Sequence, residues 1–172
     1  MDQLTEADVR ESFLNCSKGD AKKLTLPGPL ADIEWSELDF LGWRDPKAPE
    51  RAYIVAPLDG RIVGIALRSS SKSGGKSLMK STMCSICLTV HASSGVSLFT
   101  AQRAGASGRG GNSVGTYICS DLQCSRYVRG RLKSEAVYSL GETIDVETRI
   151  ERLRDKIDQF TAKVAGQYAA GS

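Results

Sequence analysis

Two closely spaced pairs of cysteines are the feature of this 172-residue chain that most restricts its fold. Two residues separate Cys84 from Cys87, and four residues separate Cys119 from Cys124. Two such pairs, a few tens of residues apart, are typical of a structural zinc site in which each pair supplies two tetrahedral ligands. Four thiolates fill the coordination sphere, so we expect one structural Zn²⁺ with no position open to water or substrate.

Other uses of these cysteines are open at this point. Four cysteines can also hold an iron–sulfur cluster, form disulfides, act as a redox pair or lie buried independently of one another. Disulfides are rare in a reduced compartment, and a redox pair normally lies in a βαβ unit, whereas this region resembles hairpins. We expect Cys16, far from the others, to be a small packing residue. His91 follows Cys87 at ligand spacing, but four cysteines already satisfy a zinc ion, so we expect a polar loop or strand residue.

The remaining pattern predicts an α+β fold built on antiparallel hairpins. An Asp59-Gly60 turn joins two β-rich segments, and a Gly-rich tip at 104–112 joins two more. A knuckle, a hairpin and a helix that starts at the second cysteine pair form a treble-clef zinc finger. The predicted helices are residues 5–17, about 120–133 and about 145–165, and the predicted strands are 51–57, 61–68, 95–103 and 113–118.

The last helix carries one apolar seam with charged flanks. The seam consists of Val146, Ile150, Leu153, Ile157, Phe160 and Val164. We expect it to pack against the N-terminal helix, which Thr5 caps with Asp8 three residues later. The predicted organisation is an N-terminal helical segment at 1–45, an α/β zinc-binding domain at 46–142 and a C-terminal amphipathic helix at 143–172.

Charge is distributed unevenly along the chain. Residues 1–60 carry seven Lys and Arg and twelve Asp and Glu, whereas residues 61–133 carry eleven basic residues and a single acid, Asp121. A segment this one-sided produces a positive field that favours an anionic partner such as RNA or an acidic protein face. The chain has no apolar run long enough to span a bilayer, and its acidic N-terminus does not resemble a signal peptide. We therefore expect a cytoplasmic protein that does not bind a membrane.

The chain resembles the FBP-type treble-clef zinc-finger family over roughly residues 40–133. The resemblance rests on the C-x2-C and C-x4-C spacing and on Leu41-Gly42-Trp43-Arg44-Asp45-Pro46, the Asp59-Gly60 hairpin through Arg68, Met83 to Cys87, and Tyr117 to Cys124. That family includes the FusB-type elongation factor G-binding proteins, which confer fusidic acid resistance. It implies zinc ligation by Cys84, Cys87, Cys119 and Cys124, and a helical bundle joined to a zinc-binding domain that binds elongation factor G and releases it from the ribosome.

Two classes of function follow from these observations. The first is a non-catalytic, translation-associated protein that binds elongation factor G, the ribosome and its RNA, or both. An RNA- or DNA-binding zinc finger without a role at the elongation factor is the alternative. A closed four-cysteine sphere, one histidine and no recognisable triad argue against an enzyme and against a small-molecule substrate. The residues expected to contact the partner are Arg126, Arg129, Lys133, Lys72, Lys76, Lys80 and the aromatic Tyr117.

Overall fold

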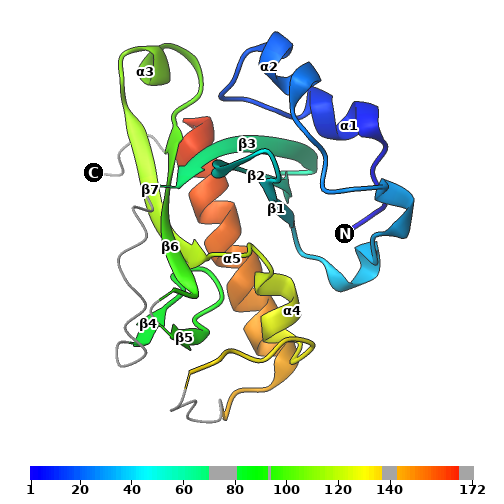
Figure 1. Cartoon of the computed structure of the whole chain (residues 1–172), viewed down its shortest axis with the longest axis vertical. Helices are drawn as coiled ribbons and strands as arrows, with labels where there is room; N and C mark the ends of the chain where they lie inside the picture. Colours follow the sequence, from blue (N-terminus) through cyan, green and yellow to red (C-terminus); the bar gives the residue numbers. More distant parts are fainter. Residues whose placement is uncertain (70–80, 93, 137–142, 167–172) are drawn as a thin grey trace.

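A five-stranded antiparallel sheet organises the molecule (Figure 1). The computed structural model describes residues 1–69, 81–92, 94–136 and 143–166. The strand order is β1-β2-β3-β6-β7, and β4 and β5 form a separate two-stranded sheet beside it. The strands are β1 (Leu41–Asp45), β2 (Ala48–Leu58), β3 (Arg61–Ser69), β4 (Ser81–Met83), β5 (Val90–Ala92), β6 (Val96–Gln102) and β7 (Ser113–Cys119).

Five α-helices and two 3-10 turns surround these strands in the described part of the chain. They are α1 (Glu6–Glu11), α2 (Lys18–Lys23), η1 (Leu30–Asp32), η2 (Trp35–Glu37), α3 (Gly105–Arg109), α4 (Cys124–Val128) and α5 (Val146–Ala165). The predicted α+β class with antiparallel hairpins is confirmed. None of the described helices is both long enough and apolar enough to cross a membrane.

The predicted hairpin between β2 and β3 forms at Asp59-Gly60. Both turn residues have left-handed backbone angles, with φ of 49° and 73°, and Leu58 pairs with Arg61 across them. Such a two-residue turn matches the natural twist of an antiparallel pair. The two strands therefore pair from the turn as far as Arg51 and Arg68 and form the centre of the sheet.

At β2 and β3 both faces of the sheet are buried, since side chains alternate between two apolar clusters. On β2, Ile54 and Ala56 belong to one cluster, while Tyr53 and Val55 belong to the other. This alternation follows from the two-residue period of a strand. A sheet of this kind needs a covering layer on each side, and the two ends of the chain supply the two layers.

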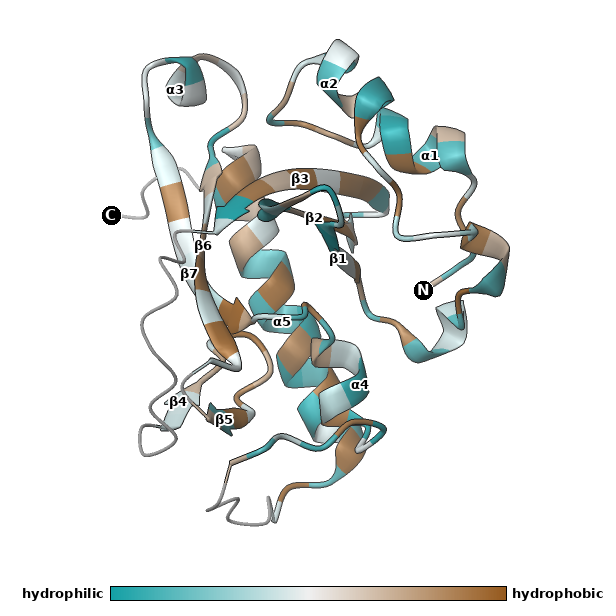
Figure 2. Ribbon diagram, viewed as in Figure 1, coloured by the Kyte–Doolittle hydropathy of each residue, from teal (hydrophilic) through white to brown (hydrophobic). Residues whose placement is uncertain are grey.

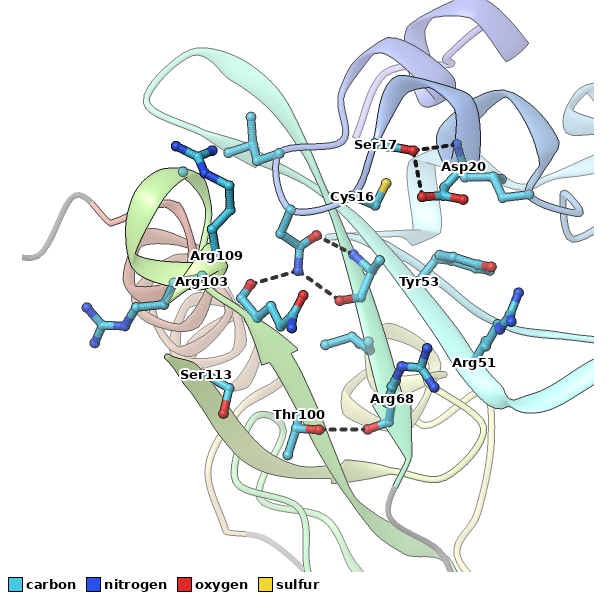
Figure 3. A pocket seen from close by; sticks show the side chains of 18 of the residues that line it. Cys16, Ser17, Asp20, Arg51, Tyr53, Arg68, Thr100, Arg103, Arg109 and Ser113 are labelled. Carbon is cyan, nitrogen blue, oxygen red and sulfur yellow. Dashed lines mark hydrogen bonds between the residues drawn. The ribbon is translucent and has the colours of Figure 1, made fainter. Parts of the chain in front are cut away.

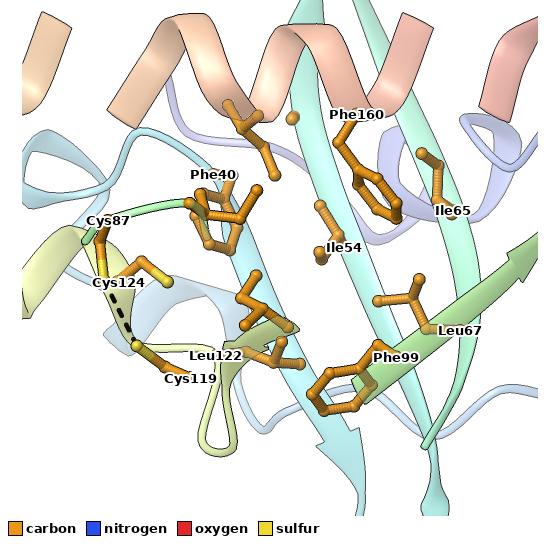
Figure 4. Close-up of a cluster of buried hydrophobic side chains, with 14 of the residues drawn as sticks. Phe40, Ile54, Ile65, Leu67, Cys87, Phe99, Cys119, Leu122, Cys124 and Phe160 are labelled. Atoms are coloured by element: carbon orange, nitrogen blue, oxygen red, sulfur yellow. Dashed lines mark hydrogen bonds between the residues drawn. The ribbon is translucent and has the colours of Figure 1, made fainter. Parts of the chain in front are cut away.

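The C-terminal helix α5 covers one face of the sheet. Leu153, Ile157 and Phe160 of its seam are buried in one cluster with strand residues such as Ile54 and Ile65. Figure 4 shows Phe160 pointing from α5 toward Ile54 and Ile65. Asp145 caps the start of α5 by accepting a hydrogen bond from the Thr148 amide, and Figure 2 shows hydrophobic and hydrophilic residues alternating along the helix. The amphipathic helix predicted at 145–165 is confirmed.

The prediction that α5 packs on the N-terminal helix was wrong. Val9 of α1 lies in the other cluster, with Trp43, Tyr53 and Val55, on the opposite face of the sheet from the α5 seam. An apolar stripe on a helix can pack against a sheet or against another helix. The periodicity of the sequence alone therefore could not identify the surface on which α5 packs. The three-part division of the chain remains a prediction, although β1 places the end of the 1–45 segment inside the sheet.

The N-terminal helix is shorter than the predicted 5–17 segment. Its start is as expected, with Thr5 and Asp8 forming a capping box. It ends at Glu11 because the chain next docks on β3, where the Gly64 amide donates to the Ser12 carbonyl and the Leu14 amide donates to the Gly64 carbonyl. Bonds to a distant strand replace the bonds that would have continued the helix.

Candidate metal centre

The four predicted zinc ligands meet at one buried point. The sulfur atoms of Cys84, Cys87, Cys119 and Cys124 all lie within 4.8 Å of one another, and all four residues are buried. Sγ of Cys84 is 3.8 Å from Sγ of Cys124, and Sγ of Cys87 is 3.4 Å from Sγ of Cys119. Tetrahedral zinc with Zn–S bonds of about 2.3 Å separates its sulfur ligands by about 3.8 Å. The cluster therefore fits one zinc ion.

The first pair is held in a tight turn between β4 and β5. The amides of Ile86 and Cys87 both point at the Cys84 sulfur, at 3.4 Å, and the Leu88 amide donates to the Cys84 carbonyl at 3.0 Å. Leu88 has a left-handed φ of 60°, which is costly for a residue with a side chain. Amide hydrogen bonds stabilise thiolate charge on Cys84, so the turn is built to hold a ligand.

The second pair lies where β7 ends and α4 begins. Leu122, between Cys119 and Cys124, also has φ of 60°, and its side chain is buried. It lies against Gly42 of β1, where an added Cβ would come within 2.8 Å of the Leu122 Cβ. The glycine thus allows the metal-binding turn to contact the sheet directly.

His91 supports the metal centre from outside the ligand set. Its Nε2 lies 3.2 Å from the Cys119 sulfur, and its ring contacts Tyr127 edge-on at 4.7 Å. Tyr127 in turn donates to Asp121 at 2.9 Å. His91 is expected from the sequence to be a polar loop or strand residue; it lies in β5 and is buried against a ligand. A hydrogen bond to a metal-bound sulfur fixes the ligand and balances its charge.

The four thiols cannot all ionise without a cation. Burial raises the pKa of the Cys124 thiol well above its ordinary value, and the neighbouring sulfurs add to this effect. The hydrogen bond with Cys119 instead lowers the pKa of the Cys87 thiol. Buried negative charges repel one another, so only part of the set can be thiolate. A divalent cation stabilises all four thiolates at once, which is the chemistry of a closed structural zinc site.

The knuckle between β4 and β5, the β6–β7 hairpin and the short helix α4 together form a treble-clef zinc finger. The family model described as FBP C-terminal treble-clef zinc-finger matches residues 8–164, and the chain belongs to this family. A search of curated proteins and a search of solved structures gave no match. The family covers the N-terminal segment and α5 as well as the finger, so both layers on the sheet are part of the family's fold.

The arginines that follow the second cysteine pair face acidic residues of the N-terminal segment. Helix α4 begins at Cys124 and ends at Val128, instead of spanning the predicted 120–133, so Arg129 and Lys133 lie beyond the helix that carries Arg126. Arg126 lies 3.7 Å from Glu34, and Arg131 lies 3.0 Å from Glu37. Part of the charge asymmetry of the sequence is therefore balanced within the molecule.

Arg129 takes part in a buried ion network that sequence analysis did not find. It pairs with Asp39, whose side chain is fully buried and also accepts from Nε of Arg154 at 2.8 Å. The Asp39 amide donates to Ser125 Oγ at 3.0 Å. The network ties the N-terminal segment, α4 and α5 together beside the metal centre. Its members are far apart in the sequence, and no local pattern pairs them.

The other residues predicted to contact a partner have different surroundings. Lys133 is exposed, and Tyr117 of β7 is 53% exposed. Lys72, Lys76 and Lys80 lie outside the described residues. The described residues thus leave Tyr117, Lys133 and part of Arg126 accessible, while Arg129 has a structural role.

Loss of one ligand should empty the site. We expect wild-type protein to contain one zinc per chain, and Cys124→Ser to lose the metal and much of the stability of residues 80–133, because the folding free energy there includes metal-binding free energy. Elemental analysis and thermal unfolding measure both effects. Cys16→Ser is the matched control and should keep one zinc. Full zinc content in Cys124→Ser would contradict the assignment.

Removal of the His91 hydrogen bond should weaken zinc binding without removing a ligand. We expect His91→Phe, which keeps a ring but loses the N–H group, to bind zinc about 10- to 100-fold more weakly. Competition with a colorimetric chelator measures the affinity. Unchanged affinity would show that His91 only fills space. A variant that binds no zinc at all would show that it is a ligand.

Disruption of the buried ion network should destabilise the fold. We expect Arg129→Gln to lower the free energy of unfolding by about 3 kcal/mol, since it leaves buried Asp39 with Arg154 as its one remaining cation among the described residues. Arg126→Gln removes an exposed pair and should cost less than about 1 kcal/mol. Urea denaturation measures both. Equal effects of the two substitutions would contradict a structural role for Arg129.

Proposed function

We propose that this protein is a non-catalytic, translation-associated binding protein whose zinc finger contacts elongation factor G on the ribosome and promotes release of the factor. The observation that carries the proposal is a closed metal centre with two large apolar side chains exposed beside it, Met83 and Tyr117. Family membership supports it, because the chain resembles the FusB-type proteins within that family. A buried set of four sulfur ligands leaves no position for a substrate, which favours binding over catalysis.

Met83 and Tyr117 form a candidate docking patch on the finger. They are 54% and 53% exposed, and the Ser85 amide, two residues after Met83, donates to the Tyr117 carbonyl at 2.7 Å. Methionine and tyrosine are enriched in protein interfaces, where a few such residues supply most of the binding free energy. The metal holds both strands in place, so the patch is preorganised.

Positive charge near the finger suits the rim of such an interface. Lys133 is exposed, and the Arg126 side chain is 43% exposed with only a long contact to Glu34. Rim charges mainly raise the association rate and make binding depend on salt. We assign Arg129 no contact with the partner, because Asp39 already holds it. Helix α4 has five residues, which is short for a recognition helix in a DNA groove and disfavours the DNA-binding alternative.

Substitution of the docking patch should separate binding from folding. We expect the double variant Met83→Ala/Tyr117→Ala to bind purified elongation factor G at least about 30-fold more weakly, which corresponds to loss of about 2 kcal/mol from an interface hot spot. Isothermal titration calorimetry measures the affinity, and zinc content reports the fold. Leu14→Ala is the control, since Leu14 is 42% exposed on the N-terminal segment. Wild-type affinity in the double variant would contradict this docking patch, and absence of binding by the wild type would overturn the proposed function.

A further inference from the structure

The described surface contains a large basic groove away from the four metal-binding cysteines, lined by the α1–α2 segment, the sheet and α3. Its volume is about 1060 Å³. We propose that this arginine groove, defined by Arg51, Arg68, Arg103 and Arg109, binds the phosphodiester backbone of single-stranded RNA. In Figure 3 the labelled arginines stand on two sides of the pocket, with Cys16, Ser17 and Asp20 on a third side.

The groove exists because two neighbouring strands of the sheet diverge. Strands β3 and β6 pair at Arg68 with Thr100 and at Ser69 with Phe99. Beyond these pairs, the Asn15 side chain bridges the gap. Its amide nitrogen donates to the carbonyls of Ala66 and Gln102, both at 2.9 Å, and its oxygen accepts from the Ala66 amide at 2.8 Å. Asn15 thus satisfies the backbone where the strands separate and holds the groove open.

Two arginines lie side by side on one wall of the groove. Arg51 of β2 and Arg68 of β3 are direct cross-strand partners, so their side chains leave the same face of the sheet. Like charges in this position are destabilising unless something neutralises them. Both side chains are exposed, and neither forms an ion pair with a described residue. The arrangement is suited to an anionic ligand that lies between the two guanidinium groups.

The tip between β6 and β7 fixes the other two arginines. Gly108 packs so tightly on the Arg103 carbonyl that an added Cβ would lie 1.7 Å from that oxygen. The Ala104 amide donates to the Val164 carbonyl of α5 at 2.8 Å, and the Asn112 amide donates to the Ser107 carbonyl at 3.1 Å. Neither Arg103 nor Arg109 has an ion-pair partner within the described ranges. A rigid backbone therefore presents two unneutralised cations.

The acidic residues that line the groove are already engaged. Asp20 accepts a hydrogen bond from the Ser17 hydroxyl at 2.6 Å at the start of α2. Asp45 is buried, accepts from the Lys47 amide at 2.9 Å and faces the Tyr53 hydroxyl at 3.5 Å. Neither carboxylate pairs with any of the four arginines. The lining has five Lys and Arg, with Lys23 beside the four arginines, against these two carboxylates, so the groove keeps a formal net charge of +3 for a ligand.

Phosphodiester is the anion that this lining fits best. A guanidinium group binds phosphate oxygens with two parallel N–H bonds, and spaced arginines can contact successive phosphates of one strand. An acidic protein partner would also need an apolar centre made of several side chains, whereas the described lining of the groove offers Leu14, which is 42% exposed, and an aromatic ring, Tyr53, that is buried. With no exposed ring for base stacking, recognition should be through the backbone and largely independent of base sequence.

The arginine groove deepens the proposed function by adding an RNA-binding site separate from the docking patch at Met83 and Tyr117. It rests on that function for the choice of RNA, since a protein that acts on ribosome-bound elongation factor G works on an RNA surface. The two sites are chemically different, one apolar and one cationic. Substitutions in the arginine groove should therefore weaken RNA binding, and substitutions in the docking patch should weaken binding of elongation factor G.

Fluorescence anisotropy with labelled U20 and A20 RNA tests the groove. We expect wild-type protein to bind both similarly, with an affinity that falls as salt rises. Arg68→Gln/Arg103→Gln should reduce the slope of log affinity against log salt by about 1.4, because each phosphate contact with a single strand contributes about 0.7. Arg61→Gln/Lys156→Gln removes the same charge at exposed positions outside the groove and should leave the slope within about 0.3 of wild type. Zinc content and thermal unfolding confirm that each variant is folded.

Several outcomes would overturn the inference. The inference is wrong if the wild type shows no salt-dependent RNA binding, or if the groove and control variants lose equal RNA affinity. It is also wrong if polyglutamate displaces RNA at equal charge concentration, or if dT20 binds more tightly than U20. Saturable binding of uridine monophosphate as tight as that of U20 would reassign the groove to a free nucleotide. Calorimetry with elongation factor G separates the two proposals, since the groove variant should keep wild-type affinity for the factor and Met83→Ala/Tyr117→Ala should keep wild-type affinity for U20.

Discussion

Ligation of one metal ion by four buried sulfurs is the interaction on which the rest of this structure depends. The ligands come from two turns that contain left-handed leucines, Leu88 and Leu122, and each turn is strained on its own. The metal site compensates for that strain, because bound zinc stabilises the folded form of both turns together. Through Leu122, the second turn is fixed against Gly42 of β1 and so aligned with the whole sheet. The finger is thereby a rigid extension of the sheet and not an appended module.

The sheet needs both ends of the chain. Its two faces are apolar at β2 and β3, where α5 covers one face and the N-terminal segment covers the other. The two layers are also connected at the side, where Asp39 from the N-terminal segment meets Arg129 beside α4 and Arg154 on α5. A buried carboxylate with two arginines contributes geometric specificity more than net stability. It fixes the N-terminal layer relative to the metal centre, and the family match at residues 8–164 includes both layers.

Positive charge in the middle of the chain serves two purposes. Around α4, Arg129 pairs with buried Asp39 and has a structural role, while Arg126 and Arg131 form more exposed pairs with Glu34 and Glu37. In the arginine groove the cations have no acidic partner among the described residues, and the backbone that bears them is tightly packed. Cations left unneutralised on a rigid surface are available to a ligand, whereas paired ones are not. Whether a basic residue is available to a ligand therefore depends on whether an acidic side chain already pairs with it, and not on the number of basic residues in the segment.

The sequence by itself determined the metal centre, the hairpin at Asp59-Gly60, the capped start of α1 at Thr5 and the seam of α5. Each of these depends on residues close together in the chain or on a regular period, where local chemistry restricts the outcome. Only the tertiary structure decided that α5 packs on the sheet and that α1 ends where the chain hydrogen-bonds to Gly64 instead. It also decided that His91 contacts Cys119 and that Arg129 forms an ion pair with Asp39. These outcomes depend on which surfaces meet. An apolar stripe or a charged side chain defines the kind of partner it needs, but not where along the chain that partner lies.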